Sequence, residues 1–183
     1  MQRCINHFAL AFLALRRGRF DAAQAHAEVS RQHAALADYR RGLAMDALLR
    51  ADIRARRGDH AAALGALAEG KAAFARLGII EGINFEFEAR VLRLLGRVDE
   101  AQRAIEDGLR VAATFPVEAA WLQHELVLTQ QARGEREAAL AAAHDAMALF
   151  ERLGAPRMVE AVRAMVARMS PRVPRAAGAE PLT

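Results

Sequence analysis

Several residue pairs in this chain have the types and spacing that chemistry requires, but none extends to a complete catalytic or metal-binding set. Cys4 and His7 are three residues apart, as two metal ligands on one helical face would be, yet structural zinc needs four ligands and no second pair has suitable spacing. His124 and Glu125 begin like a zinc-protease motif, but Leu128 stands where the second histidine is required. We therefore expect neither a metal nor a cofactor.

The other candidates for chemistry are equally incomplete. His26 and His33 lie two helical turns apart, which fits a solvated helix face. Lys71 follows Gly70 without the remaining residues of a phosphate-binding loop. No Ser or Cys stands in a recognisable nucleophile motif, so only a triad assembled in space could support nucleophilic catalysis. The sequence thus predicts a protein that is not an enzyme.

The polar residues with the clearest potential to bind a ligand are Glu86, Arg90 and Arg93. Spacings of four and three residues place them on one face of a helix. One carboxylate and two guanidinium groups in that arrangement can hold a carboxylate or a phosphate through paired N–H···O bonds. The pattern indicates binding of a ligand or partner rather than catalysis.

A repeat must position these residues. Four glycines are spaced 40, 38 and 38 residues apart, and each is followed five residues later by an alanine. The residues seven before and twelve after each glycine are also small, which predicts close helix crossings. We expect Gly108→Leu, at such a crossing, to be destabilising through overpacking, and Gly82→Ala, near a helix start, to matter less. The four columns are Ala11, Ala51, Ala89 and Val127; Gly18, Gly58, Gly96 and Gly134; Ala23, Ala63, Ala101 and Ala139; and Ser30, Gly70, Gly108 and Ala146.

This period indicates stacked helical hairpins, because short turns at the glycines force antiparallel neighbours. The predicted fold is all-α, a right-handed α-solenoid of about four antiparallel helical hairpins plus a C-terminal capping helix. It occupies residues 1–169, and the prolines of 170–183 indicate a disordered tail or linker. The expected helices cover 5–17, 20–37, 43–57, 59–77, 79–95, 98–113, 117–133, 135–153 and 156–169.

Composition excludes several classes of protein. The net charge of +4 and the pI of 10.4 invite a nucleic-acid function, but Lys71 is the single lysine and acidic residues are spread along the whole chain. No basic patch with a known module is present, so we expect no direct contact with nucleic acid. The longest apolar run, from Phe8 to Leu15, is too short to span a membrane. The lone Cys4 fits a reducing compartment, and we expect a cytoplasmic protein.

The small columns carry a resemblance to tetratricopeptide repeats, in which a small residue, a turn glycine and an alanine recur in a helical hairpin. The matching residues are Ala11-Gly18-Ala23, Ala51-Gly58-Ala63, Ala89-Gly96-Ala101 and Val127-Gly134-Ala139. Longer units of this kind resemble the repeats of bacterial transcription regulators of the MalT and LuxR type. The segment from Phe150 to Arg157 is similar to the end of such arrays, and Pro181-Leu182-Thr183 is similar to the residues that lead into their DNA-binding domain.

The resemblance implies a non-catalytic interaction or sensor domain, cut from a transcription regulator, that binds a protein partner or a small effector. The alternative is a free-standing scaffold that binds a peptide or a partner helix. Since nothing precedes the first helix to cover Ile5, Phe8 and Phe12, we also expect either a homodimer through that helix or truncation from a longer array.

The expected binding surface is the concave face, which the first helix of each hairpin lines. The residue types at these positions change from repeat to repeat. Such variation is expected if the face binds a ligand, and it is also expected if the face only contacts solvent. We expect Arg90→Ala and Arg93→Ala to weaken binding without loss of helix content. The candidate residues are Phe12, Asp52, Glu86, Arg90, Arg93, His124 and Gln131.

Overall fold

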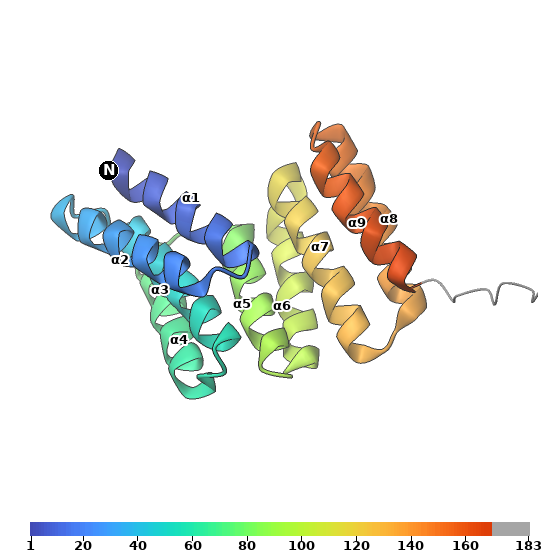
Figure 1. Ribbon diagram of the computed structural model, residues 1–183, viewed down its shortest axis with the longest axis horizontal. Helices are drawn as coiled ribbons and strands as arrows, with labels where there is room; N and C mark the ends of the chain where they lie inside the picture. The colour runs from blue at the N-terminus through green and yellow to red at the C-terminus, as the bar shows by residue number, and fades with distance from the viewer. Residues whose placement is uncertain (170–183) are drawn as a thin grey trace, which may run out of the picture.

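The computed structural model describes residues 1–169, and all regular structure in this range is helical (Figure 1). The predicted tail or linker at 170–183 lies outside the described residues. The elements are α1 (Gln2–Arg16), α2 (Phe20–Leu36), α3 (Arg40–Arg56), α4 (His60–Leu77), α5 (Gly82–Leu94), α6 (Val98–Val111), the short 3₁₀ helix η1 (Ala112–Thr114), α7 (Pro116–Arg133), α8 (Arg136–Arg152) and α9 (Pro156–Met169).

All nine predicted α-helices are confirmed, and the largest shifts are three residues at the starts of α1, α3 and α5. α1 and α3 begin three residues earlier than expected, at Gln2 and Arg40, and α5 begins three residues later, at Gly82. The later start has a local cause. The Ile79 amide donates to the Phe74 carbonyl at 3.2 Å and so closes the end of α4, while Glu81 is extended, with φ −132° and ψ 147°. A new helix can start only after that extended residue.

The turn glycines explain why the chain reverses at a fixed interval. Gly18, Gly58, Gly96 and Gly134 have φ of 69°, 80°, 77° and 78°, a left-handed conformation that glycine adopts without steric cost. The amide after each glycine bonds back to the carbonyl five residues earlier, as from Arg19 to the Ala14 carbonyl at 2.9 Å. This bond satisfies a carbonyl that the helix end leaves free. The repeated glycine is therefore a helix stop.

The small columns lie where helices cross, as predicted. A Cβ atom added at Gly108 would lie 2.6 Å from the Cβ of Phe85 and 2.9 Å from a methyl carbon of Leu122. The equivalent atom at Gly70 would lie 2.6 Å from a methyl carbon of Leu48. Real Cβ atoms do not approach so closely, so both glycines are required by packing.

Gly82 is more crowded than a position near a helix start suggests, and the smaller effect of Gly82→Ala relative to Gly108→Leu stays a prediction. Its amide donates to Oε2 of Glu118 at 2.6 Å, and an added Cβ would lie 3.0 Å from the Cβ atoms of Ala112 and Glu118. The start of α5 is pressed against η1 and α7, so alanine at position 82 would meet nearly the same crowding as at position 108. A position near a helix start is open only if no neighbouring element covers it.

The helices pack in adjacent pairs along the long axis of the molecule (Figure 1). α1 packs with α2, α3 with α4, α5 with α6 and α7 with α8, while α9 covers α8 through Val159, Val162 and Met165. The first helices also contact one another in the order α1, α3, α5 and α7. Among the residues described, no helix combines the length and hydrophobicity that crossing a membrane would take.

Side chains of α1 contact α5 and α7 as well as its hairpin partner α2. The rings of Phe8 and Phe12 lie 6.5 and 6.0 Å from the ring of Phe87 in α5, and Arg16 at the end of α1 reaches Trp121 in α7. α1 therefore lies across the other first helices at the middle of the array. This crossing determines what becomes of the predicted concave face.

Candidate binding face of the first helices

Arg90, in the middle of α5, joins three helices. It is only 4% exposed, and its guanidinium donates from Nη1 to Oδ2 of Asp52 in α3 at 3.3 Å and from Nε to Oε2 of Glu125 in α7 at 3.3 Å. Its Nη2 bonds Glu86, one turn earlier in α5. Each of these carboxylates is at least 96% buried. One buried cation thus faces three buried anions.

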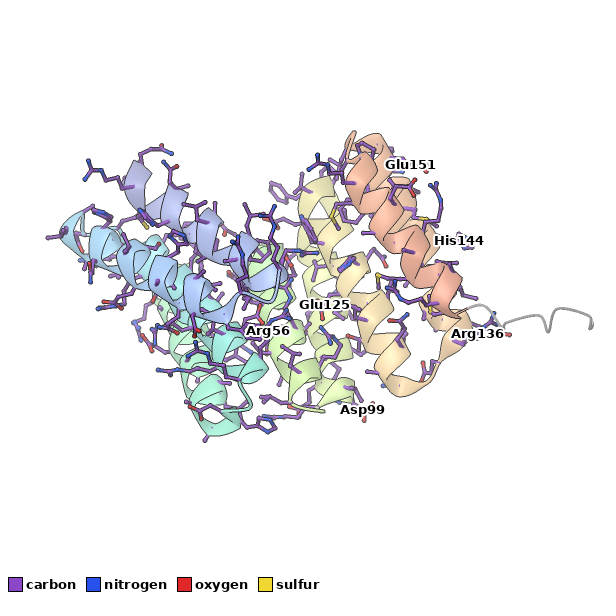
Figure 2. All side chains as sticks on the ribbon, in the orientation of Figure 1. Arg56, Asp99, Glu125, Arg136, His144 and Glu151 are labelled. Atoms are coloured by element: carbon purple, nitrogen blue, oxygen red, sulfur yellow. The ribbon has the colours of Figure 1, made fainter. Side chains whose placement is uncertain are left out.

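Two further arginines balance that charge. Arg56 donates from Nε to Oδ1 of Asp52 at 2.7 Å, and Arg93 donates from Nε to Oε1 of Glu125 at 2.6 Å. The result is an alternating chain of charges across α3, α5 and α7, which we call the ionic cluster: Asp52, Arg56, Glu86, Arg90, Arg93 and Glu125. Figure 2 shows Arg56 and Glu125 near the middle of the molecule, where the end of α1 approaches.

Aromatic side chains cover the cluster from the side of α1. The Arg90 guanidinium carbon lies 5.6 Å from the ring centre of Phe12 and 5.3 Å from that of Phe87. Arg16 lies above the same region, with its guanidinium carbon 4.3 Å from the ring centre of Trp121 and 5.7 Å from that of Phe12. Cations are attracted to ring faces at such distances, so α1 is held against α5 and α7 by aromatic and cation–π contacts.

Burial and neighbouring charges set the protonation of the cluster. Burial raises the pKa of Glu86 even though Arg90 acts in the opposite direction. Burial would also raise the pKa of Glu125, but the attraction of Arg90 and Arg93 prevails and lowers it. For Arg90, burial disfavours the charged form, and the three surrounding carboxylates more than compensate and raise its pKa. The arginine is a permanent cation, and Glu86 is more easily protonated than Glu125.

His124 lies at the edge of the cluster in a neutral state. It is 8% exposed, and burial together with the charge of Arg16 lowers its pKa to about 4. Its ring packs edge-on against Trp121 at a centroid distance of 5.7 Å, and its Nδ1 has no hydrogen-bond partner within residues 1–169. A pKa this low is unsuited to proton transfer near pH 7. His124 and Glu125 are therefore neighbours in sequence with different roles: the imidazole packs against Trp121, and the carboxylate pairs with arginines.

The predicted binding residues divide into two groups. Asp52, Glu86, Arg90 and His124 are buried, whereas Phe12, Arg93 and Gln131 are partly accessible. The expectation of an open groove at all seven positions does not hold, because α1 and the aromatic rings close its centre. The binding role of these residues stays a prediction, and it now applies to the partly accessible side chains of Phe12, Arg93 and Gln131.

Sequence reasoning missed Arg16, Arg56, Trp121 and Glu125. The pair Asp52 and Arg56 could have been found, since an acidic and a basic residue four apart share a helix face. Glu125 lies nine residues before its turn glycine and so outside the chosen columns, and no sequence signal connects it to Arg90, 35 residues away. Trp121 is the only tryptophan of the chain, which was a usable signal.

The other pairs singled out in the sequence do not assemble a reactive site. Cys4 is buried, with its Sγ 3.5 Å from Oγ of Ser30. His7 instead meets His26, at 3.1 Å between their Nδ1 atoms, with the His33 ring 6.2 Å from that of His7. Over residues 1–169, no group of three or more His, Cys, Asp and Glu residues has a geometry that could hold a metal ion.

The face therefore presents paired charges and aromatic rings. No protein-family model matches the chain, and no curated protein matches it in sequence.

Proposed function

We propose that this chain is a non-catalytic interaction domain that binds a polypeptide partner on the face formed by α1, α3, α5 and α7. In this proposal the helix pairs are about four antiparallel hairpins of a right-handed α-solenoid, similar to tetratricopeptide repeats. Such arrays bind partners with side chains that the repeat does not need for its own packing. The face would serve the same purpose here.

One observation carries the proposal. The crossings between helices are filled by small residues, while the larger side chains of the four first helices gather at one place on a shared face. Arg16 from α1 and Trp121 from α7 come from opposite ends of that face, and Gln131 lies farther along α7, partly exposed. Rigid aromatic residues next to arginines are the composition that protein-binding surfaces favour.

A small effector is the second candidate, and one cavity favours it. A space of about 150 Å³ lies between α1, α3 and α5, with Phe8, Met45 and Ile83 in its lining. Sites for drug-sized ligands usually enclose 300 to 1,000 Å³. The cavity is small by that measure, and the cavities of about 300 to 430 Å³ are not lined by Phe12, Arg93 or Gln131, so we favour a polypeptide partner.

The broader assignment to a MalT/LuxR-type transcription regulator rests on the resemblance of the repeat and of the segment from Phe150 to Arg157. A free-standing cytoplasmic scaffold is the alternative. The reading frame in the genome separates the two, because a regulator would continue past Thr183 into a helix-turn-helix domain, whereas a scaffold would not.

The binding proposal can be tested without a known partner. Peptides are selected against the folded domain from a random twelve-residue library, and their affinities are measured by fluorescence anisotropy. Gln131→Glu, on α7, should weaken binding about fivefold or more, because it places a new charge on the face. Gln24→Glu makes the same change on α2 and should leave the affinity unchanged. Binding that responds only to Gln24→Glu would place the functional surface on the second helices.

A further inference from the structure

The charges around the ionic cluster do not balance. Four guanidinium groups face three carboxylates in this part of the molecule, counting Arg16 with the cluster: Arg16, Arg56, Arg90 and Arg93 against Asp52, Glu86 and Glu125. The arginine in excess is Arg16, which has no carboxylate partner among residues 1–169. Arg16 is therefore an unpaired cation within residues 1–169, on the outer side of the cluster.

Arg16 is held in place although it has no ion-pair partner. Its guanidinium lies between the rings of Trp121 and Phe12, while the residue as a whole is exposed. Partial burial of the guanidinium and the nearby charge of Arg90 lower its pKa. A cation fixed by aromatic rings beside other cations is preorganised for a negatively charged ligand, because little side-chain freedom remains to be lost on binding.

Arg56 and Arg93 have Nη donors without a hydrogen-bond partner in residues 1–169. Each of them uses Nε to bond a buried carboxylate. Their side chains are 26% and 16% exposed. Their inward bonds orient both guanidinium groups and leave N–H donors on the solvent side.

We propose that Arg16, with Arg56 and Arg93 beside it, forms an anion-binding site that takes the side-chain carboxylates of an acidic segment in a polypeptide partner. The site rests on the proposed function, since it specifies the chemistry of the partner on the same face. Carboxylates match the planar guanidinium fork, and several in sequence could follow the row of arginines.

The local geometry favours an acidic polypeptide over the other anionic ligands. Cavities of about 300 to 430 Å³ are lined by residues other than Arg16, Arg56 and Arg93. The open surface at these arginines suits a chain laid across it better than an enclosed small molecule. Single-stranded nucleic acid needs free aromatic faces for base stacking. Trp121 already stacks with Arg16 and meets Phe150 and His124 edge-on, so it offers no such platform.

The test uses a fluorescein-labelled hexaglutamate peptide, with hexaglutamine as the neutral control. Binding is followed by anisotropy and, with unlabelled peptide, by the fluorescence of Trp121, which reports directly on Arg16. We expect saturable binding of hexaglutamate and a change in tryptophan emission with the same midpoint. Arg16→Gln should weaken binding about tenfold or more. Arg17→Gln removes the same charge at the next residue, which touches neither ring, and should change the affinity less than about twofold.

Equal weakening by Arg16→Gln and Arg17→Gln would overturn the site, since general attraction to a basic protein would then explain the binding. Anisotropy binding without a change in tryptophan emission would also overturn it. Tighter binding of an oligothymidine than of hexaglutamate, with the same sensitivity to Arg16→Gln, would overturn the polypeptide as the occupant. If library-selected peptides bind but ignore Arg16→Gln, the anion site fails and the proposed function stands. If neither hexaglutamate nor any library peptide binds, the proposed function fails together with the site.

Discussion

Removing the central guanidinium with Arg90→Ala should destabilise the fold severely. Within residues 1–169, Glu86 has Arg90 as its only ion-pair partner, whereas Asp52 retains Arg56 and Glu125 retains Arg93. The substitution therefore leaves one buried carboxylate without a cation and two with half of their former partners.

Breaking a buried ion pair by removing one partner costs about 3–5 kcal/mol. A domain of this size has about 5–15 kcal/mol of stability in total, so the loss is a large fraction of it. Protonation of Glu86 relieves part of the penalty, because a neutral carboxyl is easier to bury. The cost should accordingly be smaller at pH 5 than at pH 7. A variant with so little stability left should be partly unfolded and should lose helix content. The sequence had instead led us to expect unchanged helix content in Arg90→Ala.

The assay is urea unfolding followed by Trp121 fluorescence and by circular dichroism, at pH 7 and at pH 5. Arg31→Ala is the control, since Arg31 pairs with Glu28 on an exposed helix face and such pairs contribute about 0–1 kcal/mol. Adding Glu86→Gln to Arg90→Ala should recover part of the lost stability at pH 7. The reasoning is refuted if Arg90→Ala costs no more than Arg31→Ala.

Three further predictions follow from the packing and the charges. The pKa of His124 is lowered to about 4 in the fold from its ordinary value of 6.5, so stability that is fully present above pH 6.5 is lost as pH falls through 4. The expected loss is about 3 kcal/mol. A pH series of unfolding midpoints should therefore be flatter for His124→Gln than for the unmutated protein. Gly108→Ala should cost about 1–3 kcal/mol through overpacking, whereas Gly65→Ala, with no atom within 4 Å of the new Cβ, should stabilise by about 0.5–1 kcal/mol; equal urea midpoints would contradict this. Leu10 and Leu13 are 45% and 48% exposed on α1, so if α1 mediates a homodimer, Leu13→Glu should convert it to a monomer in light scattering.

The repeat could be predicted from sequence because it is local. A glycine with positive φ, an alanine at a helix crossing and a proline at the start of α7 each leave a trace in residue type at a fixed spacing. Those traces placed helix ends within about three residues. The crowding at Gly82 could not be predicted in this way, because it comes from Ala112 and Glu118, which are distant in sequence.

The ionic cluster could not be predicted in the same way. Arg90 meets Asp52 and Glu125 across 38 and 35 residues, and such contacts depend on the register between repeats. The positions were identified as facing a groove, but their burial depends on how far α1 lies across α5 and α7. Helix periodicity gives the direction in which a side chain points and does not say what covers it.

Hydrogen–deuterium exchange on the domain with and without a library-selected peptide tests the central claim most directly. A partner bound to the face of the first helices should slow amide exchange in α1, α3, α5 and α7, with the largest effect around Arg16 and Trp121, and leave α2, α4 and α6 unchanged. Protection confined to the second helices or to α9 would contradict the claim.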